Sequence, residues 1–148
     1  MRVAAKSQWD EKQIVGFLKT EEIPIRLAFL DRDGSPRICS LWYQYADGVI
    51  WLASHKSSFL VSQLKESGVV SFEVSTNDYP YKGVRGKAAV ELLQKGAAGV
   101  LDDLIAKYLK DGNTPLAAWL KSRARDEFAI KLTPSTVNAW DFSHRMEA

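Results

Sequence analysis

Short apolar runs separated by turn residues dominate the first half of the chain. Three of them have the spacing of strands, at residues 25–30, 36–45 and 49–54. They are joined by Asp31-Arg-Asp-Gly34 and by Ala46-Asp-Gly48, which are typical of tight turns because glycine accepts a positive φ. This pattern predicts three consecutive antiparallel strands.

The hydrophobic spacing changes from two to nearly four after the third strand. Residues 59–64 suit one short helix, which Ser57 or Ser58 can cap. Asp10 can likewise cap a helix that runs to about residue 20. The other predicted elements are strands at 69–75, 81–93, 127–132 and 136–142 and helices at 99–110 and 115–124.

The chain has the length of one domain, and neither an internal repeat nor a long linker divides it. We therefore expect a single domain over residues 1–148. Its net charge is only +2, so nothing in the composition argues for binding to nucleic acid or to an anionic membrane. Cys39 is the only cysteine, which fits a reducing compartment, and we expect a cytoplasmic protein.

The common catalytic signatures are absent from the sequence. There is no Gly-x-Ser-x-Gly elbow, no phosphate-binding loop and no His-Glu-x-x-His helix. Only His55 and His144 can supply an imidazole, and Cys39 has no partner at the spacing of a metal site, so no metal is expected. Cys39 lies within a strand pattern, where a buried structural thiol is the simplest interpretation.

One polar group of residues remains as a candidate site. It consists of Arg37 and Ser40 on the second strand and of Ser54-His-Lys-Ser-Ser58, where the third strand passes into the short helix. Hydroxyls, a cation and the unpaired N–H groups of a helix start all favour an anion, so this loop can bind a phosphate. The alternative is a capped loop that is only solvated.

The order of these elements resembles the flavin-binding split-barrel family typified by pyridoxamine 5′-phosphate oxidase. The resembling segments are Leu30 to Arg37, Trp51-Leu-Ala-Ser54, the helix that starts after Ser58, Pro80-Tyr-Lys-Gly-Val-Arg-Gly86 and the ending Trp140 to Met146. The resemblance implies a mainly β fold with flanking helices, a six-stranded antiparallel Greek-key split barrel. It also implies a homodimer with FMN at the subunit interface, or F420, FAD or haem in its place.

The resemblance assigns roles to individual residues. Arg37 matches the arginine that helps to hold the flavin phosphate, and Cys39, Ser40 and Leu41 match the backbone that passes the isoalloxazine ring. Ser54 matches a threonine that contacts ring and phosphate, and Ser58 matches the serine that opens the phosphate helix.

The chain departs from the family pattern directly after Ser58. The family has a pair of basic residues there, whereas this chain has Phe59-Leu60. The residues that can replace the lost cations are His55, Lys56 and Arg85, the last from a neighbouring strand of this subunit or of the other. The apolar pair can instead serve to pack the helix on the barrel or to line a site for another ligand.

Three functions remain open from the sequence. The first is a flavin-dependent oxidoreductase that acts on a small molecule lying against aromatic walls such as Trp42, Tyr79 and Tyr81. The second is a flavin or haem carrier or sensor without turnover. The third is a nucleic-acid module, because Gly83-Val-Arg-Gly86 matches the Gly-x-x-Gly loop of KH domains, although that loop joins two helices and this one lies in a strand pattern.

Overall fold

A computed structural model describes residues 1–146, and its first half contains the two predicted hairpins. β2 (Ile25–Leu30) pairs antiparallel with β3 (Pro36–Leu41), and β4 (Gln44–Ala46) pairs with β5 (Val49–His55). Gly34 and Gly48 take φ values of 76° and 80° in the two connecting turns. The turn residues therefore act as the sequence predicted.

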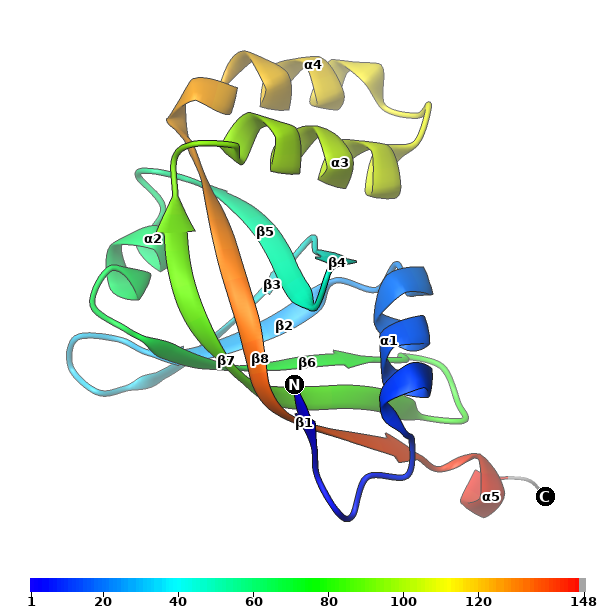
Figure 1. The fold of residues 1–148 in the computed structure, drawn as a ribbon. Coiled ribbons are helices and arrows are strands. Elements are labelled where there is room, and N and C mark those ends of the chain that lie inside the picture. The colour runs from blue at the N-terminus through cyan, green and yellow to red at the C-terminus, as the bar shows by residue number, and fades with distance from the viewer. Residues whose placement is uncertain (147–148) are drawn as a thin grey trace.

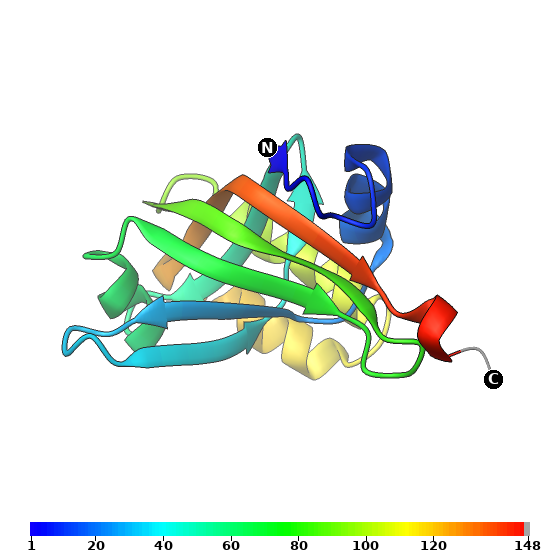
Figure 2. The same ribbon diagram turned by 90° about the horizontal axis from the view of Figure 1, so that it is seen from below.

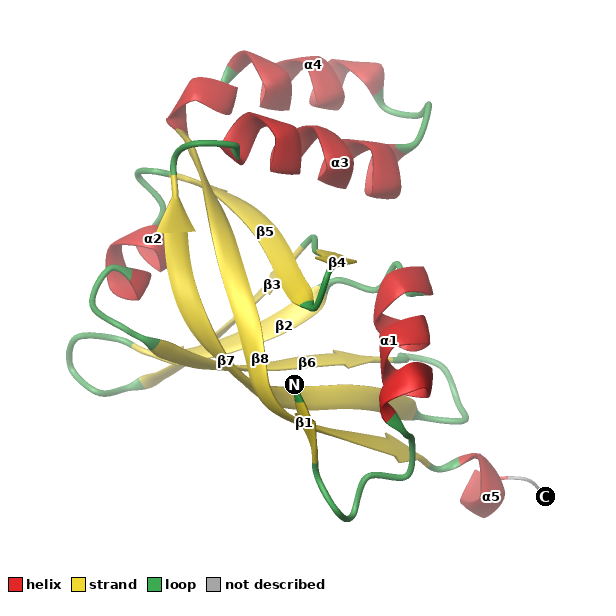
Figure 3. Ribbon diagram, in the orientation of Figure 1, coloured by secondary structure: helices red, strands yellow, loops and turns green. Residues whose placement is uncertain are grey.

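The long return strand predicted at 36–45 is wrong, because Trp42 and Tyr43 interrupt it. β3 pairs with β2 at one end of the strand order, whereas β4 pairs with β5 at the other end. The two edges of the sheet are thus only two residues apart along the chain, which closes the sheet into a barrel (Figure 3). Tyr43 is fully buried at this crossing, and its hydroxyl donates to the Glu21 carbonyl at 3.2 Å.

The second half of the barrel is built from α2 (Phe59–Leu64), β6 (Val69–Ser75), β7 (Lys82–Leu93) and β8 (Glu127–Asp141). The strand order is β3-β2-β6-β7-β8-β5-β4, with the short β1 (Arg2–Val3) pairing parallel to β8. The sheet has eight strands and not the expected six. Counting β3 and β4 as one interrupted strand and leaving out β1 accounts for the difference.

The two C-terminal strands predicted at 127–132 and 136–142 form one continuous strand, β8. Pro134 lies inside it, opposite Ala88, where the register with β7 shifts between Lys87 and Ala88. The shift leaves Ser135 as an extra residue, and its hydroxyl donates to the Lys87 carbonyl at 3.2 Å. Such a bulge accepts a proline, which lacks the N–H that a regular ladder needs.

Gly83 and Gly86 lie where neighbouring strands leave no room for a side chain. A Cβ on Gly86 would lie 2.5 Å from the Thr136 carbonyl oxygen, and one on Gly83 would lie 2.6 Å from the Ser75 side chain. Both glycines therefore allow neighbouring strands to approach closely. They lie inside β7 and not between two helices, which removes the structural basis of the KH comparison.

Helices cover two sides of the barrel (Figures 1 and 2). α1 (Glu11–Thr20) begins at the Asp10 cap and packs beside β4, as Figure 1 shows. α3 (Ala97–Leu109) lies across β5 and β8, and α4 (Thr114–Ser122) packs on α3 to form a helical hairpin. A 3₁₀ turn (Ala124–Asp126) leads from this hairpin into β8, and α5 (Ser143–Met146) follows it. No helix in residues 1–146 is long and apolar enough to cross a membrane.

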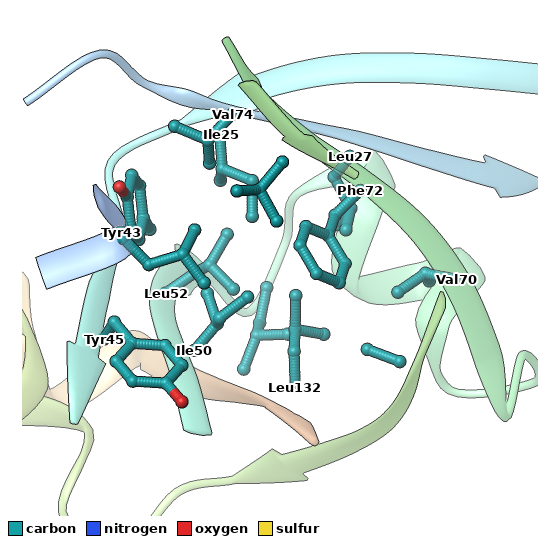
Figure 4. Close-up of a cluster of buried hydrophobic side chains, with 14 of the residues drawn as sticks. Ile25, Leu27, Tyr43, Tyr45, Ile50, Leu52, Val70, Phe72, Val74 and Leu132 are labelled. Carbon is teal, nitrogen blue, oxygen red and sulfur yellow. The ribbon is translucent and has the colours of Figure 1, made fainter. Parts of the chain in front are cut away.

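The core fills the inside of the barrel (Figure 4). Inward-facing side chains from six strands meet there with Tyr43, which lies between β3 and β4; among the strand residues are Leu27, Leu52, Phe72 and Leu132. Alternate residues of β6 are buried, as the predicted pattern requires. Because the interior is filled by side chains, a ligand has to bind at the barrel's ends or outer faces.

Candidate cofactor and ligand site

Ser54 and Ser58 meet where β5 gives way to α2. Their hydroxyl oxygens are 2.8 Å apart, and the Ser58 hydroxyl also accepts the backbone N–H of Val61 at 3.1 Å. Ser58 is therefore the N-cap of α2, as predicted. The first-turn N–H groups of Phe59 and Leu60 have no acceptor within the helix, so they remain available to an external oxygen.

His55 and Lys56 are both held within this loop. The N–H of Ser57 donates to His55 Nδ1 at 3.2 Å, and the Ser57 hydroxyl lies 2.7 Å from the same nitrogen. Lys56 Nζ lies 2.6 Å from Asp126 Oδ1, and His55 Nε2 lies 3.9 Å from Asp126 Oδ2. The hydrogen bond from Lys56 is the main reason that the pKa of Asp126 lies below its usual value. The cation of Lys56 therefore already has a partner.

Arg37 reaches the start of α2 from β3. Its Nε donates to Asp31 Oδ2 at 2.8 Å, and this bond holds the pKa of Asp31 below its ordinary value. The Arg37 guanidinium carbon lies 5.8 Å from the centre of the Phe59 ring. The structure thus brings Arg37 and the N-terminus of α2 together, as the resemblance implied.

Phe59 and Leu60 differ in what they contact. Phe59 is 56% exposed, with its ring 6.4 Å from that of Phe29, whereas Leu60 is only 7% exposed and belongs to the core. Leu60 therefore packs the helix on the barrel, which was one of the two interpretations of the apolar pair. Phe59 lies on the surface, at the position where the family has a cation.

The other β3 residues divide between two faces. Cys39 and Leu41 face the same side as Leu27 and Ile25, their partners on β2, and both pack against the core. Ser40 points to the opposite, outer face, so it is not brought together with Arg37. Partial burial raises the pKa of the Cys39 thiol, as the interpretation of a structural cysteine expects.

Arg85 and Tyr81 lie far from the Ser54–Ser58 loop within this chain. On β8, Glu127 pairs with His55 and Asn138 pairs with Arg85, so the strand partners of His55 and Arg85 lie eleven residues apart along β8. Arg85 instead stacks on Trp140, with its guanidinium carbon 5.1 Å from the ring centre. It can contribute to the loop only from a second copy of the chain.

A pocket of about 250 Å³ adjoins the loop, between the barrel and the helical hairpin. Ser54 and His55 border it, so it adjoins the Ser54–Ser58 loop that can bind a phosphate. Its apolar walls are Leu41, Trp42, Leu101, Leu104, Trp119 and Leu120. Of the predicted substrate walls only Trp42 lies here, stacked on Tyr108 with ring centres 5.2 Å apart, whereas Tyr79 and Tyr81 are exposed elsewhere.

Sequence reasoning missed two charged residues of this pocket, Arg123 and Glu127. Both stand where the helical hairpin joins β8, in a segment that reads as a polar connection. Glu127 is only 8% exposed because α3 and α4 pack over this end of the barrel. No local sequence pattern marks Glu127 as a site residue. It becomes one through its pairing with His55 on β5.

No family model matches the sequence, and no curated protein matches it. Solved structures do match. A conserved hypothetical protein from Mycobacterium tuberculosis superposes with a TM-score of 0.81 at 19% identity, over 100% of this chain and 95% of that one. An F420 reductase gives 0.68 at 18% identity, over 82% and 93% of the two chains.

A protein of the pyridoxinephosphate oxidase family from Clostridium acetobutylicum gives a TM-score of 0.66 at 19% identity, over 91% of this chain and 92% of that one. An FAD-binding protein from Mesorhizobium loti and the haem storage protein HutZ from Vibrio cholerae match as well. The chain therefore has the fold of the pyridoxamine 5′-phosphate oxidase-like proteins. The resemblance seen in the sequence is confirmed at the level of the fold.

Proposed function

We propose that this protein binds a flavin and uses it as an oxidoreductase that acts on a small molecule. The observation that carries the proposal is the position of Arg37, whose guanidinium lies against the first residue of α2 beside Ser54 and Ser58. An anion-binding group at the Ser54–Ser58 loop matches the phosphate of a flavin, and the apolar pocket next to it can receive a substrate beside the ring. FMN is the cofactor we favour, with F420 or FAD as alternatives.

The donors at this site suit a phosphate. Arg37 uses its Nε for Asp31, which leaves its terminal nitrogens to face a ligand. The first-turn N–H groups of α2 and the Ser58 hydroxyl add neutral donors, whereas the Ser54 hydroxyl already donates to Ser58. Because Lys56 is paired with Asp126, the site contains fewer available cations than the family pattern. We therefore expect weaker FMN binding than that pattern would give.

The chain itself supplies binding and orientation for the reaction. A bound flavin carries the electrons, so the protein needs few acid–base groups of its own. Arg37 and the start of α2 fix the phosphate end, and the backbone at Cys39 to Leu41 borders the ring. Leu41 and Trp42 line the adjoining pocket and keep water away from a substrate bound there.

The proposal includes a homodimer. Ile38 is 70% exposed on the outer face of β3, beside a depression of about 250 Å³ that Arg26, Glu73 and Arg85 also line. Within residues 1–146, the buried Nη1 of Arg26 has no hydrogen-bond partner. A second copy would cover the apolar surface around Ile38.

The dimer is tested by sedimentation velocity at micromolar concentration. We expect the wild type to sediment as a dimer and Ile38→Asp to sediment as a monomer, because a charge would be buried in the apolar part of the interface. Lys12→Asp, an exposed change on α1, a helix that does not line this depression, serves as the control and should remain dimeric. A monomeric wild type would contradict the shared site.

Flavin binding is tested by titrating FMN fluorescence against the wild type, Arg37→Ala and Arg32→Ala. Arg32 is also exposed and paired with an acid, Glu66, but it lies on the turn after β2 and so serves as the matched control. Arg37→Ala should raise the dissociation constant about tenfold, the value of one charge-assisted contact. Equal dissociation constants for the two variants would place the phosphate elsewhere.

A second candidate is a flavin or haem protein of this fold without turnover. The observation that favours it is Phe59, an exposed aromatic residue in place of a phosphate-binding cation. The absorbance spectrum of the purified protein separates the candidates, because haem gives a Soret band and flavin does not. A flavin spectrum would favour the carrier if neither a reductant nor a range of small oxidisable substrates led to turnover.

A further inference from the structure

Glu127 is a buried acid that the proposed flavin chemistry does not use. It is the first residue of β8, its side chain borders the pocket under the helical hairpin, and it is 8% exposed. Within residues 1–146 its carboxyl group makes no hydrogen bond or ion pair, but Arg26 Nη1 is the only fully buried side-chain polar atom without a partner, so the Glu127 oxygens keep some accessible surface at the pocket. Buried carboxylates normally have partners because desolvation of an unpaired charge is costly.

The charged neighbours of Glu127 do not supply this partner. Arg123 lies over the Trp119 ring, with its guanidinium carbon 4.3 Å from the ring centre. His55 presents Nε2 to Asp126, which is itself paired with Lys56. Burial raises the pKa of Glu127, and the attraction of His55 and Arg123 offsets this only in part.

The remainder of the pocket is apolar and aromatic. Two indoles and four leucines form its walls, and its volume of about 250 Å³ limits a ligand to one or two small rings. Trp42 stacks on Tyr108, so its ring already has a packing partner in this wall. A ligand here can pack its ring against these walls and can donate a hydrogen bond to one acid, Glu127.

We propose that this pocket binds a small planar aromatic molecule that carries a protonated nitrogen, with the ring against the tryptophan and leucine walls and the N–H groups on Glu127. A charged N–H donor supplies the missing partner of the carboxylate, and indole faces attract cations as well. The inference depends on the pocket alone and holds whether or not a flavin is bound. If the proposed enzyme activity is correct, its substrate class is the amines and amidines whose basic, protonated nitrogen is attached to a planar ring through a carbon atom.

An anionic ligand is the competing occupant, because Arg123 also borders the pocket. The guanidinium of Arg123 is already placed on an aromatic face, whereas Glu127 has no partner. A carboxylate in so small a volume would also lie near Glu127 and be repelled by it. The geometry therefore favours the cation.

The test uses three molecules of one size: benzamidine, which is cationic, benzamide, which is neutral, and benzoate, which is anionic. Each is titrated into the ¹⁵N-labelled full chain without added flavin, and the indole N–H signals are followed. We expect benzamidine to shift the signals of Trp42 and Trp119 and to bind about tenfold more tightly than benzamide, the value of one charge-assisted contact. Benzoate should bind more weakly than both.

Three variants make the test specific. Glu127→Gln should weaken benzamidine binding about tenfold while changing benzamide binding by less than about twofold. Leu120→Trp, a change on the partly buried face of α4, should block all three ligands by filling the pocket. Glu91→Gln, an exposed acid on β7, should change nothing.

Several outcomes would overturn the inference. These are no binding of benzamidine at ten millimolar, tighter binding of benzoate, or a Glu127→Gln variant that binds benzamidine as the wild type does. A failure of FMN binding in the same protein would leave the inference standing. The two proposals therefore fail separately.

Discussion

Substitution of Phe59 and Leu60 one at a time separates the two roles that this pair can have. Phe59 is 56% exposed beside Arg37, whereas Leu60 is 7% exposed in the core. We expect Phe59→Arg to leave the fold intact and to tighten FMN binding. We expect Leu60→Lys to unfold much of the population or to lower the stability severely.

The magnitudes follow from the contacts. Phe59→Arg loses an aromatic contact with Phe29 and a cation–π contact with Arg37, each worth about 1 kcal/mol, and the arginine stem recovers part of the buried area. The expected cost is therefore about 1 kcal/mol. Leu60→Lys removes buried apolar contacts worth roughly 2–5 kcal/mol and buries a charge in addition. Domains of this size have only about 5–15 kcal/mol in total.

The gain in binding comes from one restored cation at the start of α2. A hydrogen bond to a charged group contributes about 1.5–3 kcal/mol net, which corresponds to roughly 10- to 150-fold in the dissociation constant. The double variant would combine tighter FMN binding with a loss of folding stability, so the single variants are the informative ones.

The assays are urea unfolding followed by tryptophan fluorescence and FMN titration of each folded variant. Tyr79→Arg adds the same charge at an exposed aromatic position elsewhere and should change neither quantity by much. A stable Leu60→Lys variant would refute the assignment of Leu60 to the core. A folded Phe59→Arg variant with the FMN affinity of the wild type would refute the phosphate position.

Two further variants probe the barrel and the buried acid. Gly86→Ala should lower the free energy of unfolding by about 1–3 kcal/mol because its Cβ would press on the Thr136 carbonyl. Gly99→Ala, in open space on α3, should raise it by about 0.5–1 kcal/mol. Urea unfolding measures both, and equal effects would contradict the close strand approach. Burial raises the pKa of Glu127, so the folded protein holds that proton more tightly than the unfolded chain, and the free energy of unfolding should fall as pH rises from the ordinary glutamate value through the folded one. Glu127→Gln should remove this fall and be more stable than the wild type at pH 8 but not at pH 4, and parallel profiles for the two proteins would count against a buried acid.

Features that depend on neighbouring residues could be predicted from the sequence. The bounds of β2 agree with the structure, and so do the Asp10 cap and the Ser58 cap, because each is set by residues a few positions apart. The contact of Arg37 with the start of α2 joins distant segments; the sequence grouped them as one polar set, and the family resemblance assigned their roles.

Features that depend on the whole barrel could not be predicted in this way. The break at Trp42 and Tyr43 exists because the two sheet edges meet there, and no local pattern encodes that closure. Pro134 reads as a strand end, yet a bulge against β7 accepts it. Glu127 reads as the polar start of a strand until α3 and α4 cover it.

Arg37 and Lys56, the two cations beside the Ser54–Ser58 loop, each already have a carboxylate partner. The Asp31 side chain is almost entirely buried against Arg37, whereas Asp126 is partly exposed beside Lys56. An incoming phosphate must therefore bind the outer edge of Arg37 without displacing Asp31, but it can compete with Asp126 for Lys56. A dianionic phosphate competes better than a singly charged group. The loop is therefore expected to prefer a terminal phosphate monoester, such as that of FMN, to the bridging diphosphate of FAD or the diester of F420.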